Sequence, residues 1–239
     1  MIDIHSHILP EIDDGAKTVE ESVALLEQMR KQNVTTVIAT PHFYPDRENL
    51  EDFLNKRYKA YKKLTDKVGD NFPLKILLGA EVLYFSNIGS VEAVKQLTVE
   101  KSPYLLLELL GINKIDDKVI NDIIALKENL GLIPIIAHIE RYYRYKGYKR
   151  LLELFKSGGA LCHINATFLT SKAEKKVAVK LIDGQIADFI ASDCHCPKNR
   201  PVMLKSAFDT AYSMSKEGTE RIIKKTEKLE KELIDFYGK

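Results

Sequence analysis

Short apolar runs alternate with longer amphipathic segments along most of the chain. The opening residues, 1–4, alternate apolar and polar side chains, which is typical of a strand. Later apolar runs predict strands at 36–40, 75–81, 104–110, 133–138, 160–165 and 188–192. Helices are predicted between them at about 18–32, 47–67, 117–130, 148–157, 172–183 and 202–215, and a charged helix at about 217–238 closes the chain.

Two of these helices have boundary residues that the sequence identifies. Thr18 is predicted to be the N-cap of the first helix, and Glu21 completes a capping box. Asp116 or Asp117 can cap the helix that Gly131 ends.

The alternation of about seven strands with helices predicts an α/β fold on a parallel sheet. The simplest arrangement at 239 residues is a closed or distorted barrel. An open doubly wound sheet is the alternative. No linker-like stretch divides residues 1–239, so a single domain is predicted.

Composition limits the classes of function. Lys and Arg number 36 against 34 acidic residues, so the net charge of +2 implies no general field for nucleic acid or membrane. Three cysteines, an odd number, favour a reducing compartment. The first residues show no signal-segment pattern, and no apolar run approaches the ~20 residues that span a bilayer. We therefore expect a cytoplasmic, soluble protein without membrane insertion.

Residues that bind metals follow the predicted strands. His5 and His7 lie two residues apart on a strand, so both imidazoles point to one face. The strand ends also carry His42, Glu81, His138, Asp193 and His195. In α/β barrels these ends meet at one mouth, so five of the six histidines should converge there.

Two further carboxylates belong to this prediction. Glu108 lies in an apolar run, where an unpaired charge would cost several kcal/mol. Asp14 lies in a loop that can return a carboxylate to the first strand. These candidate ligands outnumber those that one metal ion needs. They therefore predict two or three divalent ions, bridged by carboxylates and a hydroxide.

Each residue alone has a simpler interpretation. A single histidine after a strand is commonly a hydrogen-bonded loop residue, Asp14 a turn residue, and Asp193 a helix cap. Glu108 could pair with a buried Lys or Arg. Their joint placement at six strand ends favours the metal site. His163 lies one step inside its strand and is predicted to be a structural wall residue.

These segments resemble a known family. The motifs are His5-Ser6-His7, Ile12-Asp13-Asp14-Gly15-Ala16, Ala39-Thr40-Pro41-His42, Gly79-Ala80-Glu81, Glu108, Ala137-His138-Ile139-Glu140-Arg141-Tyr142 and Ser192-Asp193-Cys194-His195. Together they resemble the polymerase-and-histidinol-phosphatase (PHP) metallo-phosphoesterases. The Ile-Asp-Asp-Gly-Ala and His-x-x-Arg-Tyr segments are similar to the bacterial capsule-biosynthesis tyrosine phosphatases of the CpsB/YwqE type. The family commonly has Gln where His163 stands.

The resemblance implies a PHP-type distorted (β/α)7, TIM-like barrel with three divalent metal ions, usually manganese, although iron or zinc would suit the same donors. One ion would be held by His5, His7, Glu81 and Asp193, a second by Glu81, Glu108 and His138, and the third by Asp14, His42 and His195. Arg141 and Arg200 match the family's phosphate-binding arginines. With Asp193 they are the predicted catalytic residues.

The function implied is metal-dependent hydrolysis of phosphotyrosine on protein by a metal-bound hydroxide. The partner implied is the tyrosine-rich tail of a bacterial tyrosine kinase that controls capsule or exopolysaccharide synthesis. A small-molecule phosphatase, such as a histidinol-phosphate phosphatase, is one alternative. The other is a PHP-type module that binds nucleic acid or a partner protein, and the near-zero net charge argues against nucleic acid.

Two further segments each have more than one interpretation. Cys194 and Arg200 have the Cys-x5-Arg spacing of cysteine-dependent phosphatases, but the loop lacks glycine, contains Pro197, and places Asp193 beside the thiol, which would raise its pKa. The basic, aromatic segment 141–150 is either a solvated loop or a rim that binds a phosphorylated tail, and the same composition could stack bases.

Overall fold

Parallel strands form the centre of the molecule. The computed structural model describes residues 1–112 and 114–237. Its strands are β1 (Ile2–Ser6), β2 (Thr36–Ala39), β3 (His42–Phe43), β4 (Lys75–Leu78), β5 (Glu81–Leu83), β6 (Tyr104–Glu108), β7 (Ile133–Ile136), β8 (Leu161–Asn165) and β9 (Phe189–Ala191). They pair in the orders β1-β2-β4 and β3-β5-β6-β7-β8-β9, and every pairing is parallel.

The two sheets are parts of one barrel. Only two residues separate β2 from β3, and only two separate β4 from β5, so each pair is one long strand with a break. Backbone bonds from Gly79 to Ala39 (2.9 Å) and from Glu81 to Pro41 (3.0 Å) join the two broken strands across the breaks. A parallel bridge between Ser6 and Cys194 closes the ring. Over the described residues this gives seven barrel strands and confirms the predicted α/β barrel.

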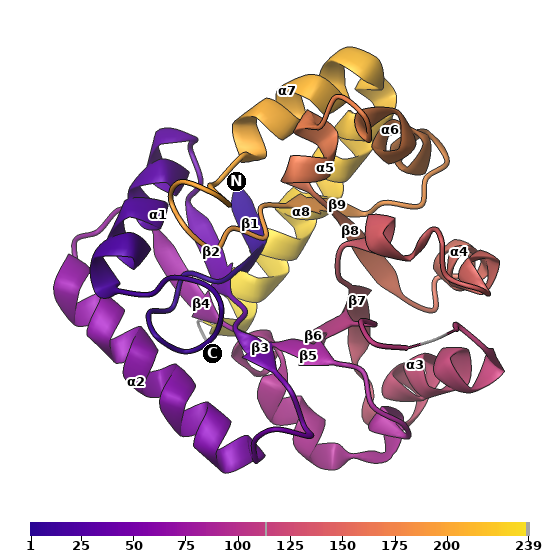
Figure 1. Cartoon of the computed structure of the whole chain (residues 1–239), viewed down its shortest axis with the longest axis horizontal. Helices are drawn as coiled ribbons and strands as arrows, with labels where there is room; N and C mark the ends of the chain where they lie inside the picture. Colours follow the sequence, from indigo (N-terminus) through magenta and orange to yellow (C-terminus); the bar gives the residue numbers. More distant parts are fainter. Residues whose placement is uncertain (113, 238–239) are drawn as a thin grey trace.

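Helices surround the strands (Figure 1). They are α1 (Val19–Lys31), α2 (Leu50–Val68), α3 (Asp117–Leu130), α4 (Tyr148–Lys156), α5 (Ala166–Thr170), α6 (Lys175–Asp183), α7 (Leu204–Met214) and α8 (Lys216–Tyr237), with 3-10 turns η1 (Ile88–Ser90), η2 (Glu92–Leu97), η3 (Val99–Lys101) and η4 (Ile139–Tyr142). The predicted helix at 172–183 is wrong at its start, since α5 ends at Thr170 and α6 begins at Lys175. The prediction of a helix from 47 is also wrong by three residues, because Asn49 caps α2.

The predicted helix boundaries at Thr18, Asp116 and Gly131 are confirmed. Thr18 accepts a hydrogen bond from the Glu21 amide at 3.2 Å. The Asp116 side chain accepts from the Val119 amide at 3.3 Å, and Gly131 ends α3 in the left-handed conformation with φ +70°. These contacts satisfy backbone groups that a helix end leaves without partners.

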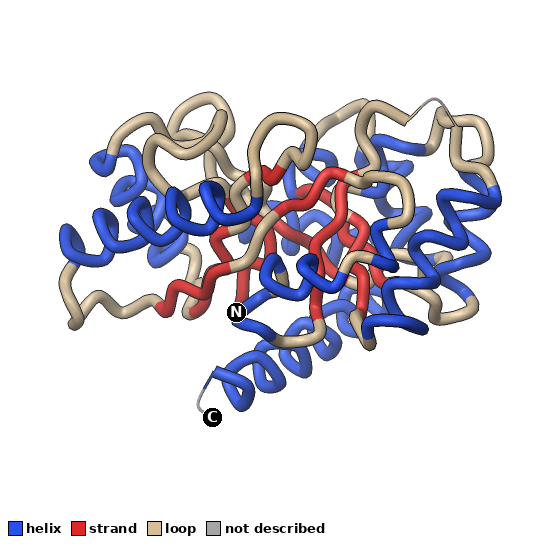
Figure 2. The backbone as a smooth tube through the Cα atoms, turned by 90° about the horizontal axis from the view of Figure 1, so that it is seen from below, coloured by secondary structure: helices blue, strands red, loops and turns tan. Residues whose placement is uncertain are grey.

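The barrel is closed at the end where its strands begin. Figure 2 shows α8 crossing that end, while the loops gather at the opposite one. Leu229 and Leu233 of α8 are buried in the cluster formed by inward strand residues such as Ile4 and Leu106. Burial of each leucine contributes about 2 kcal/mol, so α8 closes the barrel floor and leaves the opposite mouth for chemistry.

The charged stretch 224–233 has the composition of a solvated helix with i,i+4 pairs, but it packs against the barrel. Lys228 and Glu232 do form an i,i+4 pair at 3.8 Å. The helix is nevertheless docked, because its leucines are buried and Thr35 donates a hydrogen bond to Glu230 at 3.0 Å. The predicted helix end at residue 238 lies outside the described residues. None of the helices in the described part of the chain has the length and apolarity needed to cross a membrane.

Candidate metal centre

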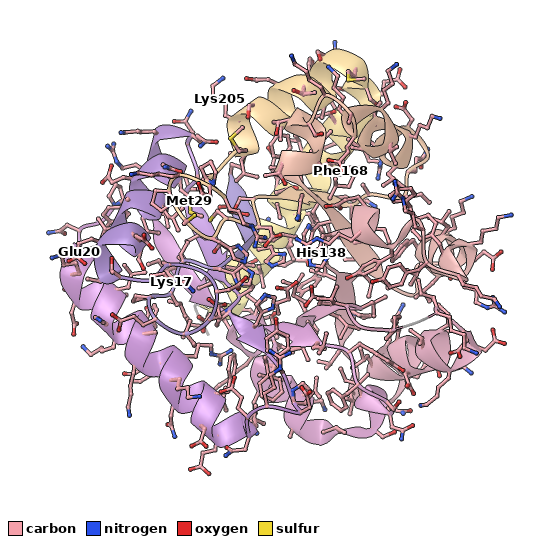
Figure 3. All side chains as sticks on the ribbon, in the orientation of Figure 1. Lys17, Glu20, Met29, His138, Phe168 and Lys205 are labelled. Atoms are coloured by element: carbon pink, nitrogen blue, oxygen red, sulfur yellow. The ribbon has the colours of Figure 1, made fainter. Side chains whose placement is uncertain are left out.

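The histidines of the first strand lie at the barrel mouth with their rings together. As predicted, His5 and His7 share a face, and their Nε2 atoms are 3.0 Å apart. Two nitrogen lone pairs at this distance need a proton or a cation between them. The His138 ring centroid lies 5.8 Å from that of His5. Figure 3 shows His138 near the middle of the molecule, whereas Glu20 and Lys205 lie at the periphery.

Glu81, at the start of β5, lies at the centre of this group. Its Oε2 is 3.1 Å from His5 Nε2, 3.3 Å from His7 Nε2 and 3.0 Å from His42 Nδ1. Its Oε1 is 2.8 Å from His138 Nε2. Burial alone would raise the pKa of this carboxyl, but the imidazoles around it lower its pKa well below the ordinary value.

Glu108 and His138 form the deep side of the centre. The Glu108 Oε1 lies 3.3 Å from His138 Nε2, and both side chains are buried. His138 follows β7 in a left-handed conformation, with φ +34°. Such strain in a histidine costs free energy and is concentrated at functional sites, where surrounding structure maintains it.

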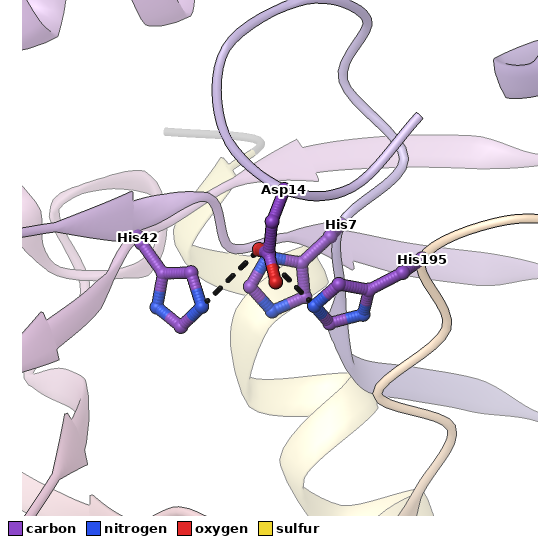
Figure 4. A group of neighbouring side chains, drawn as sticks. All are labelled: His7, Asp14, His42 and His195. Carbon is purple, nitrogen blue, oxygen red and sulfur yellow. Dashed lines mark ion pairs between the residues drawn. The ribbon is translucent and has the colours of Figure 1, made fainter. Parts of the chain in front are cut away.

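Asp14 lies on the outer side, between two histidines (Figure 4). Its Oδ1 is 3.5 Å from His42 Nε2 and 3.3 Å from His195 Nε2. The loop reaches this position through Gly15, where an added Cβ would lie 2.3 Å from the His7 carbonyl oxygen. The tight turn therefore requires glycine, and it returns the carboxylate to the first strand as predicted.

Asp193 connects the histidines to two arginines. Its Oδ1 is 3.6 Å from His5 Nε2 and 3.5 Å from His7 Nε2. Its Oδ2 accepts hydrogen bonds from Arg141 at 2.8 Å, Arg200 at 2.7 Å and Asn165 at 2.7 Å. The guanidinium groups lie at the rim, so they are placed to meet an anion that enters the mouth.

Two residues that orient these ligands, Asp13 and Asn165, have no role predicted from the sequence. Asp13 lies 2.7 Å from His7 Nδ1, and such a carboxylate fixes the ring and leaves Nε2 toward the other ligands. Its position six residues after His7, in the same loop as Asp14, was an available signal. Asn165 ends β8, and nothing in the sequence pattern pointed to its bond with Asp193.

His163 contacts the centre through His5. Its Nε2 accepts the His138 backbone N–H at 3.4 Å, so that nitrogen has a lone pair and no proton. The 2.8 Å contact between His5 Nδ1 and His163 Nε2 is then a hydrogen bond that His5 donates. This leaves His5 Nε2 unprotonated and facing Glu81. The predicted wall residue therefore sets the tautomer of a candidate ligand.

Buried polar atoms without a hydrogen-bond partner indicate whether metal ions fit at this centre. His42 Nδ1, Glu81 Oε2 and Glu108 Oε2 are buried without a hydrogen-bond partner. Donor atoms lie within 4.8 Å of one another in three groups, which are His7, Asp14, His42 and His195; His5, His7 and Glu81; and His42, Glu81 and Glu108. Imidazole and carboxylate donors without thiolate suit manganese, iron or zinc. The residues therefore fit divalent metal ions.

The competing cysteine does not share this environment. Cys194 is fully buried in the main hydrophobic cluster. Burial raises the pKa of its thiol, and the charges of Asp3 and Asp193 add to that effect. A thiol that stays protonated is a poor nucleophile.

Histidines and carboxylates at the strand C-termini of a barrel, with guanidinium groups at the rim, define the class of metal-dependent hydrolases. The family of capsular polysaccharide synthesis proteins CpsB/CapC matches residues 1–229. The chain belongs to this family, and the family expected from the motifs is confirmed.

Individual relatives agree with this assignment. The tyrosine-protein phosphatase CpsB of Streptococcus agalactiae is 31% identical over 218 residues, covering 87% of this chain and 88% of that protein. The tyrosine-protein phosphatase YwqE of Bacillus subtilis is 30% identical over 231 residues, covering 91% of this chain and 85% of that protein.

Solved structures show the same fold. One match belongs to the crystal structures of YwqE from Bacillus subtilis and CpsB from Streptococcus pneumoniae, which are described as metal-dependent tyrosine phosphatases. It has a TM-score of 0.78 at 26% identity and covers 95% of this chain and 92% of that chain. Histidinol phosphate phosphatase from Lactococcus lactis gives a TM-score of 0.58 at 14% identity, over 91% of this chain and 94% of that chain, and shows the fold alone.

Proposed function

We propose that this chain is a metal-dependent protein-tyrosine phosphatase that acts in capsular polysaccharide synthesis. The observation that supports it most is the ring of nine candidate ligands with two guanidinium groups at its rim, in a member of the CpsB/CapC family. The relatives named tyrosine-protein phosphatases and the structures described as metal-dependent support the same activity.

Three ions, most simply manganese, would be distributed over the ligands as follows. The first would bind His5, His7, Glu81 and Asp193; the second Glu81, Glu108 and His138; and the third Asp14, His42 and His195. The central position of Glu81 between His5 and His138 supports its role as a bridge. The outer group of Asp14 with His42 and His195 supports the third site.

When bound, such ions would activate a water nucleophile and neutralise charge on the phosphate. The chain itself supplies the recognition. Arg141 and Arg200 each donate to Asp193 Oδ2 and keep further N–H groups for phosphate oxygens, which the planar guanidinium fork fits. A tyrosine leaving group has a pKa of about 10, so it can depart without a strong acid.

Three further proposals concern the substrate, the cellular compartment and the domain organisation. We propose that the substrate is the tyrosine-rich tail of a bacterial tyrosine kinase that controls capsule synthesis, that the protein works in the cytoplasm, and that residues 1–239 act as a single domain. The description of the family as capsular polysaccharide synthesis proteins supports the first of these.

The test is hydrolysis of a phosphotyrosine peptide by chelator-stripped protein, with manganese added back. We expect no activity without metal, recovery with manganese, and loss in His138→Ala. Histidinol phosphate and single-stranded DNA are compared in the same assay. Preferred hydrolysis of either one, or peptide hydrolysis that survives chelation, would contradict the proposal.

A further inference from the structure

Tyr44 stacks on one of the candidate metal ligands. It follows β3, and its ring lies against that of His42, with the ring centroids 5.0 Å apart and the ring planes inclined by 23°. His42 belongs to the outer side of the centre, where Figure 4 shows it and His195 on opposite sides of Asp14. The half-buried Tyr44 ring therefore flanks the metal centre on the His42 side.

The Tyr44 ring also contacts an arginine. The guanidinium carbon of Arg47 lies over this ring, 4.5 Å from its centroid, which is the geometry of a cation–π contact. A turn sets this geometry, because the Arg47 amide donates a hydrogen bond to the Tyr44 carbonyl oxygen at 3.0 Å. Pro45, at the second position of the turn, fixes the φ angle that such a turn needs. The cation is therefore held by a turn and a ring before any substrate binds.

Arg47 is exposed and has no anionic partner among the residues that the structure describes. Its neighbour Glu48 pairs with Lys56 instead, at 2.9 Å. By contrast, the exposed Arg30 of α1 pairs with Glu27 at 2.8 Å. The guanidinium fork of Arg47 is therefore available to an anion from outside the chain.

Arg47 differs from the two arginines at the rim in its relation to the ligands. Arg141 lies 3.6 Å from Glu108, and Arg200 lies 3.9 Å from Asp14, so both contact carboxylates of the centre. Over the described residues, Arg47 reaches the centre only through the Tyr44 ring. It therefore lies outside the pair of arginines that would bind the phosphate at the metal ions.

We propose that Arg47, held on the Tyr44 ring, is a secondary anion subsite that binds a second negatively charged group of the substrate polypeptide, next to the phosphotyrosine. The inference rests on the proposed function and deepens it. The second anion is a side-chain carboxylate or the phosphate of another phosphotyrosine, since the planar fork fits either group. Because the side chain is already held in place, less conformational entropy is lost on binding.

The predicted basic rim at 141–150 offers a competing position for this anion. Arg144 lies over the Tyr143 ring, with its guanidinium carbon 5.0 Å from the ring centroid. Among the described residues, however, no candidate ligand stacks on Tyr143, and Arg150 is paired with Asp117 at 2.9 Å. Arg144 is therefore the comparison for Arg47.

The test uses capped peptides that share the same phosphotyrosine. The reference peptide has neutral neighbours. In the anionic peptides, either a glutamate or a non-hydrolysable phosphonate analogue of phosphotyrosine stands at each neighbouring position in turn. The measured quantity is the ratio of kcat/KM for an anionic peptide to kcat/KM for the neutral peptide. Because both values come from the same enzyme variant, a general change in metal loading or folding cancels.

We expect wild-type enzyme to prefer an anionic peptide by about 5-fold at the best position, chiefly through KM, which corresponds to about 1 kcal/mol. The ratio should fall to near unity in Arg47→Ala. Arg30→Ala, the matched control, removes the same charge from α1 and should keep the wild-type ratio. Tyr44→Leu should lower the ratio although Arg47 is present, whereas Tyr44→Phe retains the ring and should preserve it. The larger response, to glutamate or to phosphonate, identifies the anion.

A wild-type ratio near unity for every anionic peptide would overturn the subsite, as would an unchanged ratio in Arg47→Ala. A lowered ratio in Arg144→Ala alone would assign the second anion to the segment 141–150 and would also overturn it. Failure of metal-loaded wild-type enzyme on both the neutral phosphotyrosine peptide and p-nitrophenyl phosphate would instead overturn the proposed function, and the subsite with it.

Discussion

The metal centre has a deep half and an outer half, and the two differ in what fixes their residues. Glu81, Glu108 and His138 are about 1% exposed. Glu108 ends β6 and His138 follows β7, whereas Glu81 begins β5 just after the break in its strand, not at a strand end as predicted. Asp14 is 60% exposed, and the side chain of Arg200 is 39% exposed, both on loops. The deep half is fixed by the barrel and by charges that cannot remain unpaired. The residues of the outer half are positioned by a turn and lie in contact with solvent, so their side chains can adjust to a substrate.

The largest expected effect is in the deep half. Glu81→Gln keeps the shape of the side chain but removes the charge that four imidazoles surround. We expect kcat/KM for a phosphotyrosine peptide to fall on the order of 1,000-fold, since roughly 4 kcal/mol of charge stabilisation is lost. Metal content, measured on the purified protein by atomic absorption, should fall with it. A variant that kept its metal and its activity would show that Glu81 is not the bridging ligand.

A smaller effect is expected in the outer half. Asp14→Asn removes a charge that is largely in water, where electrostatic interactions are weaker. We expect a loss of roughly 10- to 100-fold at low manganese, from about 1–3 kcal/mol, and substantial recovery at high manganese. Activity measured across a manganese titration checks this. If Asp14→Asn were as inactive as Glu81→Gln and did not recover, the distinction between the two halves would be wrong.

The two halves also differ in how far the sequence could predict them. The deep ligands were predictable because strand ends of a parallel barrel must meet at one mouth, and the alternation of strands and helices was visible in the chain. The contact of Asn165 with Asp193 joins residues 28 positions apart at the ends of two neighbouring strands, and it depends on side-chain orientations that no local pattern encodes. The docking of α8 was not predicted either, because the segment around Leu229 and Leu233 has the charged composition of a solvated helix. The predicted ligand assignments and the single domain stay predictions.

His163, which is not a candidate metal ligand, allows a third test of the deep half. His163→Gln should preserve an acceptor for the His5 Nδ1 proton, whereas His163→Leu removes it. We expect His163→Leu to weaken metal binding about 10-fold, the lower range for loss of such an orienting partner, and His163→Gln to bind nearly as wild type. Competition with a chelating dye measures this without an activity assay. Equal affinities for the two variants would mean that His163 only fills space.

The smallest effect is expected within the segment 193–195, between two of the candidate ligands. Asp193 and His195 face the metal centre, while Cys194 between them is fully buried in the hydrophobic cluster. Cys194→Ala should therefore leave kcat/KM unchanged and should lower the free energy of unfolding by roughly 1 kcal/mol, about the value of one buried methylene-sized group. Paired kinetic and denaturation measurements separate the two quantities. A large loss of activity without loss of stability would support the thiol as the nucleophile. An unchanged rate assigns the chemistry of this segment to Asp193 and His195, which face the metal centre while the thiol does not.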